Sequence, residues 1–402
     1  MATADPIPEI TTPSERNEPG LLVLLAPMTP EQLELVLAQL TTSIPEEDLL
    51  IASPNTASDA LPADSYPTLR IIAAPAANTS WTLTAADFAN AYQLASKEKA
   101  RAILMLSPES GSLSSSSFSA LANAVLTTPT DLAVASYNLP PHAGLVNSAI
   151  LYPLTRALFA SRVRFPLAVD LGLSLRMAER LAGTAQRFNK LDQGETPLWP
   201  INEAAVAGFS IDQFDVGARV QQQHAGPDLN SILPLVTGSL FSDIELKAQY
   251  WQRFRQLPPA GDSLSVPQAA SNEAVADIAP MLQAFRLAYT NLHEIWSLVL
   301  PPNSLLGLKR LSATEAADFR MPESLWARIV FDFLLAHRLR TINRGHLLGA
   351  LIPLYLAWVA SHINITNSGI TPESHIEAVA AAFEADKTYL VSRWRWPDRF
   401  NP

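Results

Sequence analysis

The chain has 402 residues, of which 48% are hydrophobic and 16% are charged, so it is long enough to bury a large core and to form two regions. Its formal net charge of -10 repels phosphate backbones, which argues against a general nucleic-acid binder. An anionic ligand would need a local basic pocket. Because the sequence contains no cysteine, disulfides, thiolate metal sites and cysteine nucleophiles are excluded together.

Two stretches bear on the compartment of the protein. Residues 1–19 are rich in proline, threonine and glutamate, which predicts a disordered tail, and they lack the basic start and apolar core of a signal peptide. Residues 347–363 are uncharged and close to the length of a membrane span, but Gly349, Pro353 and His362 interrupt them. We therefore expect a cytoplasmic protein without a membrane span, in which this stretch is buried in a core or in the interface of a homo-oligomer.

Residues 20–136 alternate short apolar runs with amphipathic stretches, the pattern of a doubly wound, mainly parallel sheet covered by helices. This α/β pattern predicts strands at 20–26, 49–52, 69–74, 102–106 and 132–136, and helices at 30–40, 85–97 and 114–126. Ligands of such sheets bind beyond the carboxyl ends of the strands. The residues at those ends are our predicted cofactor-binding residues, and they include Pro27, Ser53, Ser107 and Glu109.

After residue 144 the apolar period becomes helical. Helices are predicted at 145–160, 171–188, 210–223, 230–256, 272–299, 322–341, 345–363 and 373–393. Residues 257–270 are rich in proline, glycine and serine and are the best candidate for a linker. We expect an α/β domain at 20–256 and an all-helical region at 271–395.

Several common site motifs are absent. No Gly-x-Gly-x-x-Gly or Gly-x-x-x-x-Gly-Lys pattern follows a predicted strand, which argues against dinucleotide binding and against a P-loop. No Gly-x-Ser-x-Gly elbow supports a hydrolase. Glu109 is the acidic residue at a strand end where an oxygen ligand for a hard cation belongs, although a solvated turn before a serine-capped helix is an equal interpretation.

Three stretches carry a resemblance to a known family. They are residues 144–181, which contain FPLAVDLG at 165–172, residues 208–226, which begin GFSIDQFD, and residues 235–251, which contain GSLF. Together with the order of the predicted elements, they resemble the nucleotide-sugar glycosyltransferases of the mannosylglycerate synthase and glucosyl-3-phosphoglycerate synthase type. The resemblance covers roughly residues 20–255 and implies a GT-A fold.

The resemblance also implies a chemistry. A hexosyl group would pass from a nucleoside diphosphate sugar to a small anionic or sugar acceptor, with Mg or Mn stabilising the departing diphosphate. Asp170 and Asp212 would be catalytic residues facing the site. Glu109 and His224 would ligate the metal. Asp170 as an ordinary helix cap, and His224 as a cap or a solvated residue, are the alternatives.

This sequence departs from the family pattern at two places. Where relatives carry Asp-x-Asp, this chain has Ser107-Pro108-Glu109, and Ala168 and Val169 replace the two glycines before Asp170. A valine side chain there would obstruct a substrate that approaches the backbone. These changes favour a second hypothesis, a catalytically inactive glycosyltransferase-like binding or assembly protein.

A basic group in the helical region is a further candidate. His337, Arg340 and Arg344 share one helix face if the helix persists that far. Arg340 and Arg344 would then clamp a phosphate or carboxylate of the ligand. The alternative is that they complement the negative end of a helix.

Overall fold

The structure is a computed structural model that describes residues 19–54, 66, 68–75, 82–190, 193–219, 228–253 and 277–397. The predicted tail, apart from residue 19, and the predicted linker at 257–270 lie outside the described residues.

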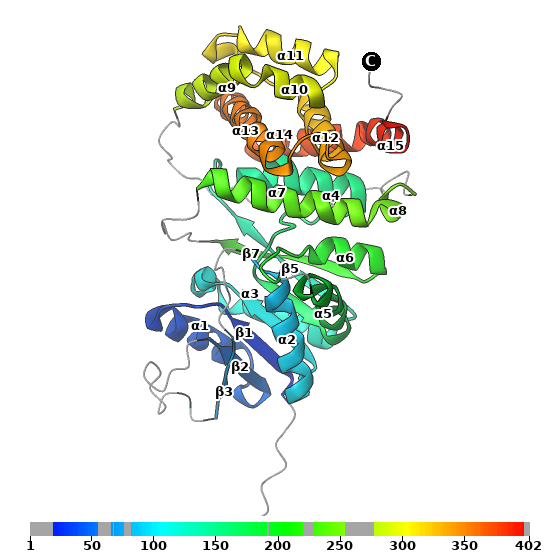
Figure 1. The fold of residues 1–402 in the computed structure, drawn as a ribbon. Coiled ribbons are helices and arrows are strands. Elements are labelled where there is room, and N and C mark those ends of the chain that lie inside the picture. The colour runs from blue at the N-terminus through cyan, green and yellow to red at the C-terminus, as the bar shows by residue number, and fades with distance from the viewer. Residues whose placement is uncertain are drawn as a thin grey trace, which may run out of the picture.

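A seven-stranded sheet forms the lower half of the molecule (Figure 1), with strand order β3-β2-β1-β4-β6-β5-β7. Neighbouring strands are parallel except at β6, which runs antiparallel to both β4 and β5. The predicted doubly wound, mainly parallel sheet is confirmed. The strands are β1 (Leu21–Leu25), β2 (Leu49–Ser53), β3 (Arg70–Ala73), β4 (Ala102–Leu106), β5 (Leu132–Asn138), β6 (Leu171–Ser174) and β7 (Ile211–Ala218).

Helices cover both faces of this sheet. Strands β1, β2 and β4 are apolar and buried along their whole length. Two pairs of helices that pack side by side cover them: α1 (Pro30–Ser43) with α3 (Ser115–Thr127), and α2 (Ala85–Glu98) with α5 (Leu175–Asn189). Strand β1 pairs with β2 on one side and with β4 on the other. The direction of winding therefore reverses between β1 and β4, and the carboxyl ends of these strands form the crevice where such sheets bind ligands.

Two predicted helices contain strands instead. The helix predicted at 171–188 begins with β6, and α5 starts only at Leu175, capped by the Ser174 side chain. The helix predicted at 210–223 is wrong over its described part, because residues 211–218 form β7 along β5. Ile211 and Phe214 have helical spacing, but pairing with the open edge of β5 decides the structure.

The second half of the molecule is helical (Figure 1). Between residues 277 and 397, within the described residues, helices alternate with short turns and no strand occurs, which confirms the predicted helical region there. A π-helical turn, η3 (Asn147–Leu151), leads into α4 (Tyr152–Phe159). The other helices are α6 (Pro200–Ala207), α7 (Leu229–Leu246), α8 (Ala248–Trp251), α9 (Ala279–Asn291), α10 (His293–Val299), α11 (Pro302–Ser312), α12 (Glu323–Leu339), α13 (Arg344–Asn367), α14 (Pro372–Ala385) and α15 (Lys387–Arg395), with short 3-10 turns at η1 (Glu46–Asp48), η2 (Pro108–Ser112) and η4 (Ala316–Asp318).

The helices form a core of their own. The α4 and α7 helices precede the predicted linker, yet they pack with α9 to α15 rather than with the sheet. Buried Arg156 of α4 ties this layer to α14, since its guanidinium donates to Glu384 at 3.0 and 3.1 Å and to Glu377 at 2.5 Å. Fork-shaped pairing of this kind fixes the two helices in one relative position.

Helix α13 contains the apolar stretch noted in the sequence. By length and composition it would be able to cross a membrane, but 72% of its most apolar 18-residue window is buried inside the molecule. Ser361 and His362, polar residues of this helix, are fully buried. The helix lies in the centre of the second core.

Gly172 of β6 offers a test of the packing. A Cβ atom at this position would lie 2.8 Å from the carbonyl oxygen of Leu121 in α3, whereas a Cβ at Gly183 of α5 would meet nothing within 4 Å. We expect Gly172→Ala to lower the free energy of unfolding by about 1–3 kcal/mol. Gly183→Ala should raise it by up to about 1 kcal/mol, because alanine favours a helix. Urea unfolding of both variants measures this, and equal effects would contradict the described contact.

His337 of α12 gives a pH dependence. Burial, reinforced by the charge of Arg344, lowers the pKa of His337 to about 4. The unfolded chain takes up this proton near pH 6.5, so the stability contributed by the neutral ring is present above about pH 6.5 and is lost as pH falls towards 4. Between about pH 7 and about pH 5 we expect the wild type to lose about 1–2 kcal/mol more than His337→Leu. Urea unfolding at both pH values checks this, and parallel losses would refute it.

Candidate functional site

Five residues meet at the carboxyl edge of the sheet, and we call them the Arg219 cluster. Ser107 and Glu109 follow β4, Tyr137 lies near the end of β5, and Arg219 follows β7. Asp170 precedes β6, and because β6 is antiparallel, its beginning lies at the edge where its neighbours end. The reversal of one strand thus brings Asp170 to the same edge as the others.

Asp170 is the centre of the cluster and is 0% exposed. Its Oδ1 accepts the backbone N–H of Ser107 at 2.8 Å, and its Oδ2 accepts the hydroxyl of Tyr137 at 2.7 Å. The Nη1 atom of Arg219 lies 4.0 Å from Oδ2. Both carboxylate oxygens are therefore engaged by groups of the protein, so this carboxylate positions its neighbours and does not face a substrate.

Arg219 joins Asp170 to Glu109. Its Nη2 donates to Glu109 Oε2 at 2.7 Å and to Ser107 Oγ at 3.0 Å, and its guanidinium carbon lies 4.9 Å from the centre of the Tyr137 ring. Two carboxylates and one guanidinium give these charged groups a formal net charge of about -1 at neutral pH. The positive charge at the carboxyl edge of the sheet thus comes from Arg219, a side chain of the protein itself.

The charges of the cluster hold each other in place. Burial lowers the pKa of Arg219, but the charges of Asp170 and Glu109 outweigh it and raise the pKa above its usual value. Burial and the adjacent charge of Asp170 raise the pKa of Tyr137 well above its usual value. Arg219 therefore stays charged and Tyr137 stays a hydrogen-bond donor throughout the physiological range.

A bulge in the β5–β7 ladder aims Arg219 at the cluster. The register shifts between Ser136, which pairs with Asp215, and Asn138, which pairs with Ala218. Gly217 lies in this irregularity with φ +80°, a conformation that glycine adopts at little cost. Bulges bend and twist a strand locally and often redirect a side chain next to a site.

A pocket of about 510 Å³ opens beside the cluster, between the sheet and the helical half. Tyr137 and Arg219 belong to its wall, together with residues of η3, α7, α9 and α13. A volume of this size is in the range of small-molecule sites.

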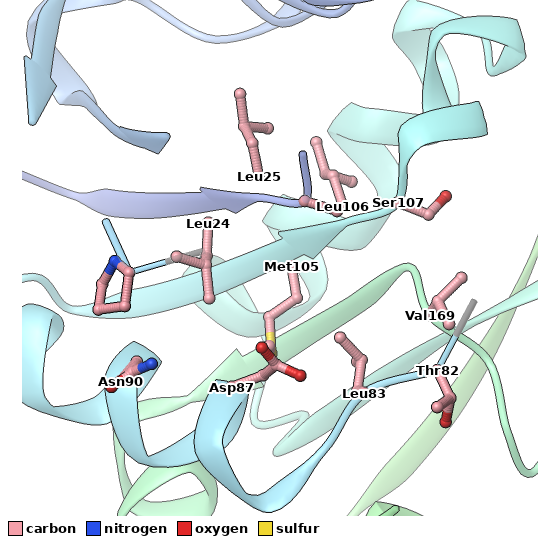
Figure 2. Close-up of a pocket in the computed structure, with 12 residues that line it drawn as sticks. Leu24, Leu25, Thr82, Leu83, Asp87, Asn90, Met105, Leu106, Ser107 and Val169 are labelled. Atoms are coloured by element: carbon pink, nitrogen blue, oxygen red, sulfur yellow. The ribbon is translucent and has the colours of Figure 1, made fainter. Parts of the chain in front are cut away.

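A second cavity, of about 30 Å³, lies at the crevice between β1 and β4 (Figure 2). Figure 2 shows Leu24 and Met105 pointing to the side of α2, where Asp87 lies, and Leu25 and Leu106 pointing to the opposite face. Asp87 accepts the backbone and hydroxyl donors of Thr84 at 2.8 Å each, so it caps α2. The cavity has room for about one water molecule, and Val169 forms part of its wall.

The cluster does not fit a divalent metal. Among the described residues no group of three or more histidine, aspartate or glutamate side chains is arranged to hold a metal ion. The carboxylate of Glu109 pairs with Arg219, and that of Asp170 is buried and engaged by protein donors. Mg and Mn prefer several oxygen ligands and water molecules, and a guanidinium at this position repels them.

Glu109 and Asp170, two of the predicted site residues, are brought together by Arg219. Ser107 joins them, whereas Pro27 and Ser53 lie at the ends of β1 and β2, where the sequence predicts them, and Ser53 is buried. The solvated-turn interpretation of Glu109 is wrong, because its side chain is paired with Arg219 and only 17% exposed. His224, the predicted metal ligand, lies outside the described residues.

Asp212 does not join the cluster. It pairs with Ala133 near the start of β7, is exposed, and accepts the hydroxyl of Thr130 at 2.5 Å. Arg219 lies seven positions further along the extended chain, which amounts to about 20 Å. Asp212 lies near the amino end of β7, whereas the Arg219 cluster lies at the carboxyl ends of the strands. The expectation that Asp212 faces the site is therefore wrong.

Arg340 and Arg344 do not share a helix face with His337. Helix α12 ends at Leu339, and Arg340 is its exposed cap with φ 53°. Arg344 pairs with Glu245 of α7 at 3.2 Å and donates to the carbonyl of His337 at 3.3 Å, at the negative end of α12. Glu245 lies nine residues, or about 13 Å, along α7 from Val236 in the pocket wall.

The sequence interpretation missed Arg219 and Tyr137. The sequence predicts a helix over residues 210–223, in which position 219 has no special place. Had 211–218 been recognised as a strand, Arg219 would have stood at a strand end like Ser107. Tyr137 follows the predicted strand at 132–136 directly, so its position was the available signal.

Comparisons with known proteins add the following. No protein-family profile matches the sequence, and no curated protein matches it. Similar solved structures include glucosyl-3-phosphoglycerate synthase from Mycobacterium tuberculosis with Mn2+ and UDP-glucose, at 15% identity over 56% of this chain and 79% of that chain, with a TM-score of 0.38. The same enzyme with phosphoglyceric acid matches at 14% identity over 56% and 80%, with a TM-score of 0.37. A further mycobacterial protein matches at 13% identity over 57% and 76%, with a TM-score of 0.38.

The glucosyl-3-phosphoglycerate synthase structures belong to one of the types of glycosyltransferase that the sequence resembles. TM-scores below 0.4 carry no argument about the ligands or activity of this chain.

The role of Asp170 in holding the Arg219 cluster together can be tested by measuring the free energy of unfolding. Asp170→Ala leaves Arg219 without one of its two carboxylates, and leaves buried donors of Ser107 and Tyr137 unpaired. We expect it to lower the free energy of unfolding by about 3–5 kcal/mol. Asp212→Ala, which removes an exposed carboxylate, should cost less than about 1 kcal/mol. Denaturant unfolding of both proteins decides, and similar losses would contradict the described burial of Asp170.

Proposed function

We propose that this protein is a glycosyltransferase that binds a nucleoside diphosphate sugar without a divalent metal, with Arg219 as the resident cation. The observation that carries the proposal is the position of Arg219, which pairs with Glu109 and lies beside Asp170. Glu109 stands where the family resemblance implies a metal ligand. The sequence resemblance supports the nucleotide-sugar class of donor.

The proposed reaction is hexosyl transfer. As the bond between the sugar and the diphosphate breaks, negative charge develops on the departing oxygen, and a fixed cation in a poorly solvated site stabilises that charge. A guanidinium also offers a planar set of donors suited to phosphate. Arg219 would supply both, whereas Asp170 and Tyr137 would hold it in position.

The same geometry predicts weak binding. Glu109 and Asp170 already offset the charge of Arg219, so the cluster is net negative towards a diphosphate. Neutralising Glu109 removes one repelling charge and releases Arg219 from one partner. A site that depends on a metal would respond in the opposite way, because Glu109→Gln would remove a ligand.

Calorimetry with UDP-glucose and GDP-mannose, each in manganese and in chelator, tests the proposal. We expect weak binding to wild type that the chelator leaves unchanged, and binding to Glu109→Gln that is about three- to tenfold tighter. Glu179→Gln, the same charge change on the exposed face of α5, is the matched control and should leave the affinity unchanged.

Two outcomes would overturn the proposal. Tight binding that the chelator abolishes, and that Glu109→Gln weakens, would show a working metal site. No binding of either nucleotide sugar to any of the three proteins would remove the donor site altogether.

A second function, a non-catalytic glycosyltransferase-like binding or assembly protein, is favoured by the burial of Asp170. A carboxylate that is 0% exposed and bonded at both oxygens is not available to take a proton from an acceptor. Nucleotide-sugar binding without release of free nucleotide in the presence of candidate acceptors would support this alternative.

A further inference from the structure

Several helices of the second core end on one side of the helical half. Helix α7 is followed directly by α8, and Figure 1 shows α8 and α15 on the same side of the molecule. The end of α12 lies there too, because Arg344 pairs with Glu245 of α7 at 3.2 Å and donates to the carbonyl of His337 at 3.3 Å. The residues at these ends line neither of the two cavities described above.

The end of α12 is joined to α15 as well. The guanidinium of Arg338 donates to the carbonyl of Trp394 at 2.6 Å, and its central carbon lies 4.2 Å from the centre of a Trp394 ring. Trp394 packs against Trp251 of α8, with ring centres 5.0 Å apart. Arg395 donates to Gln252, which follows α8, at 3.1 Å. The ends of α7, α8, α12 and α15 are therefore in contact with one another.

This junction is basic in a protein whose formal net charge is -10. Residues 245–253, 338–346 and 393–397 contain a single acidic residue, Glu245, which is paired with Arg344. Within the part of the chain that the structure describes, four arginines of the junction have no carboxylate at ion-pair distance: Arg253, Arg338, Arg340 and Arg395. An excess of positive charge thus gathers at one place on an acidic protein, which favours an anionic partner.

Large apolar side chains are exposed beside these arginines. Leu246 is 74% exposed, Leu339 is 45% exposed and Trp396 is 62% exposed. Each is adjacent or close in sequence to a residue that joins the helix ends. Single exposed apolar residues need no explanation, but three of them at one basic junction indicate an interaction surface. We call these three side chains and the four unpaired arginines the arginine-tryptophan patch.

The composition of this patch fits an anionic membrane surface. Arginines pair with lipid phosphates, and tryptophan is favoured at the level of the headgroups, where its ring is buried and its N–H stays near water. Exposed leucines are stabilised when they enter the boundary with the acyl chains. A nucleic acid also offers phosphates to the arginines, but it offers no hydrocarbon to the leucines.

We infer that the arginine-tryptophan patch docks this protein on an anionic lipid membrane. Leu246, Leu339 and Trp396 enter the boundary between headgroups and acyl chains, and the arginines pair with the negative charges of the lipids. Docking of this kind requires no helix that spans the membrane. It is independent of the proposed transfer of a hexosyl group.

Cosedimentation of the full chain with lipid vesicles tests the inference. One set of vesicles contains equal amounts of phosphatidylserine and phosphatidylcholine, and the other contains phosphatidylcholine alone. We expect binding to the anionic vesicles only, and weaker binding as salt is added, because salt screens the attraction between the arginines and the lipids.

A charge variant locates the surface. Arg340→Gln/Arg395→Gln should weaken binding to the anionic vesicles at least about tenfold, because each arginine near such a surface adds to the attraction. Lys309→Gln/Arg310→Gln removes the same charge from exposed positions of α11 and is the matched control. It should change the affinity by less than about twofold.

An apolar variant distinguishes a membrane from a purely electrostatic partner. Leu246→Ser/Trp396→Ser leaves the charge unchanged and should weaken vesicle binding at least about fivefold. Leu298→Ser/Leu306→Ser, which changes two exposed leucines of α10 and α11, is the matched control and should bind like the wild type.

Three results would overturn the inference. The first is a wild type that does not bind the anionic vesicles, or binding that both patch variants leave unchanged. The second is a wild-type dimer in analytical ultracentrifugation that Leu246→Ser/Trp396→Ser converts to a monomer, since a second copy would then cover the patch. The third is binding to polyglutamate but not to vesicles, which would assign the patch to an acidic protein partner.

Discussion

The burial of the Asp170 carboxylate is the constraint on which the candidate site depends. A charge removed from water is tolerated only when it is paired and hydrogen-bonded, and here the partners come from the ends of three other strands. Ser107 after β4, Tyr137 on β5 and Arg219 after β7 must all reach the beginning of β6. The positions of the three strand ends are therefore coupled through one side chain.

Because of this coupling, the Arg219 guanidinium is a permanent positive charge at the carboxyl edge of the sheet. A metal ion exchanges with solvent and responds to its concentration, whereas a guanidinium remains charged and keeps its place as long as its carboxylates do. The side chains of Arg219, Glu109 and Asp170 are all largely removed from water, which strengthens the pairing between them. A divalent ion would have to displace Arg219 from both carboxylates at once.

The type of apolar pattern in each segment decides which strands and site residues the sequence predicts correctly. Strands β1, β2 and β4 are buried on both faces and therefore read as continuous apolar runs, so their ends and Glu109 were found. Strand β7 has a mixed pattern at the edge of the sheet, and β6 is only four residues long. The sequence predicts helices for both, which leaves Arg219 out of the site, whereas Asp212 was expected there only because of the family resemblance.

No local sequence pattern predicts the pocket between the two halves. Its walls combine the loop after β5, the π-helical turn η3 and the helices α7 and α13, which lie far apart in sequence. Each apolar residue there has the spacing of an ordinary core residue, and only the assembled fold shows that these residues leave a space. The same holds for Arg219 Nε and Asn147 Oδ1, since a missing hydrogen-bond partner is a property of the folded chain. A sequence indicates which side chains a site has available, and packing decides which of their atoms find a partner within the protein.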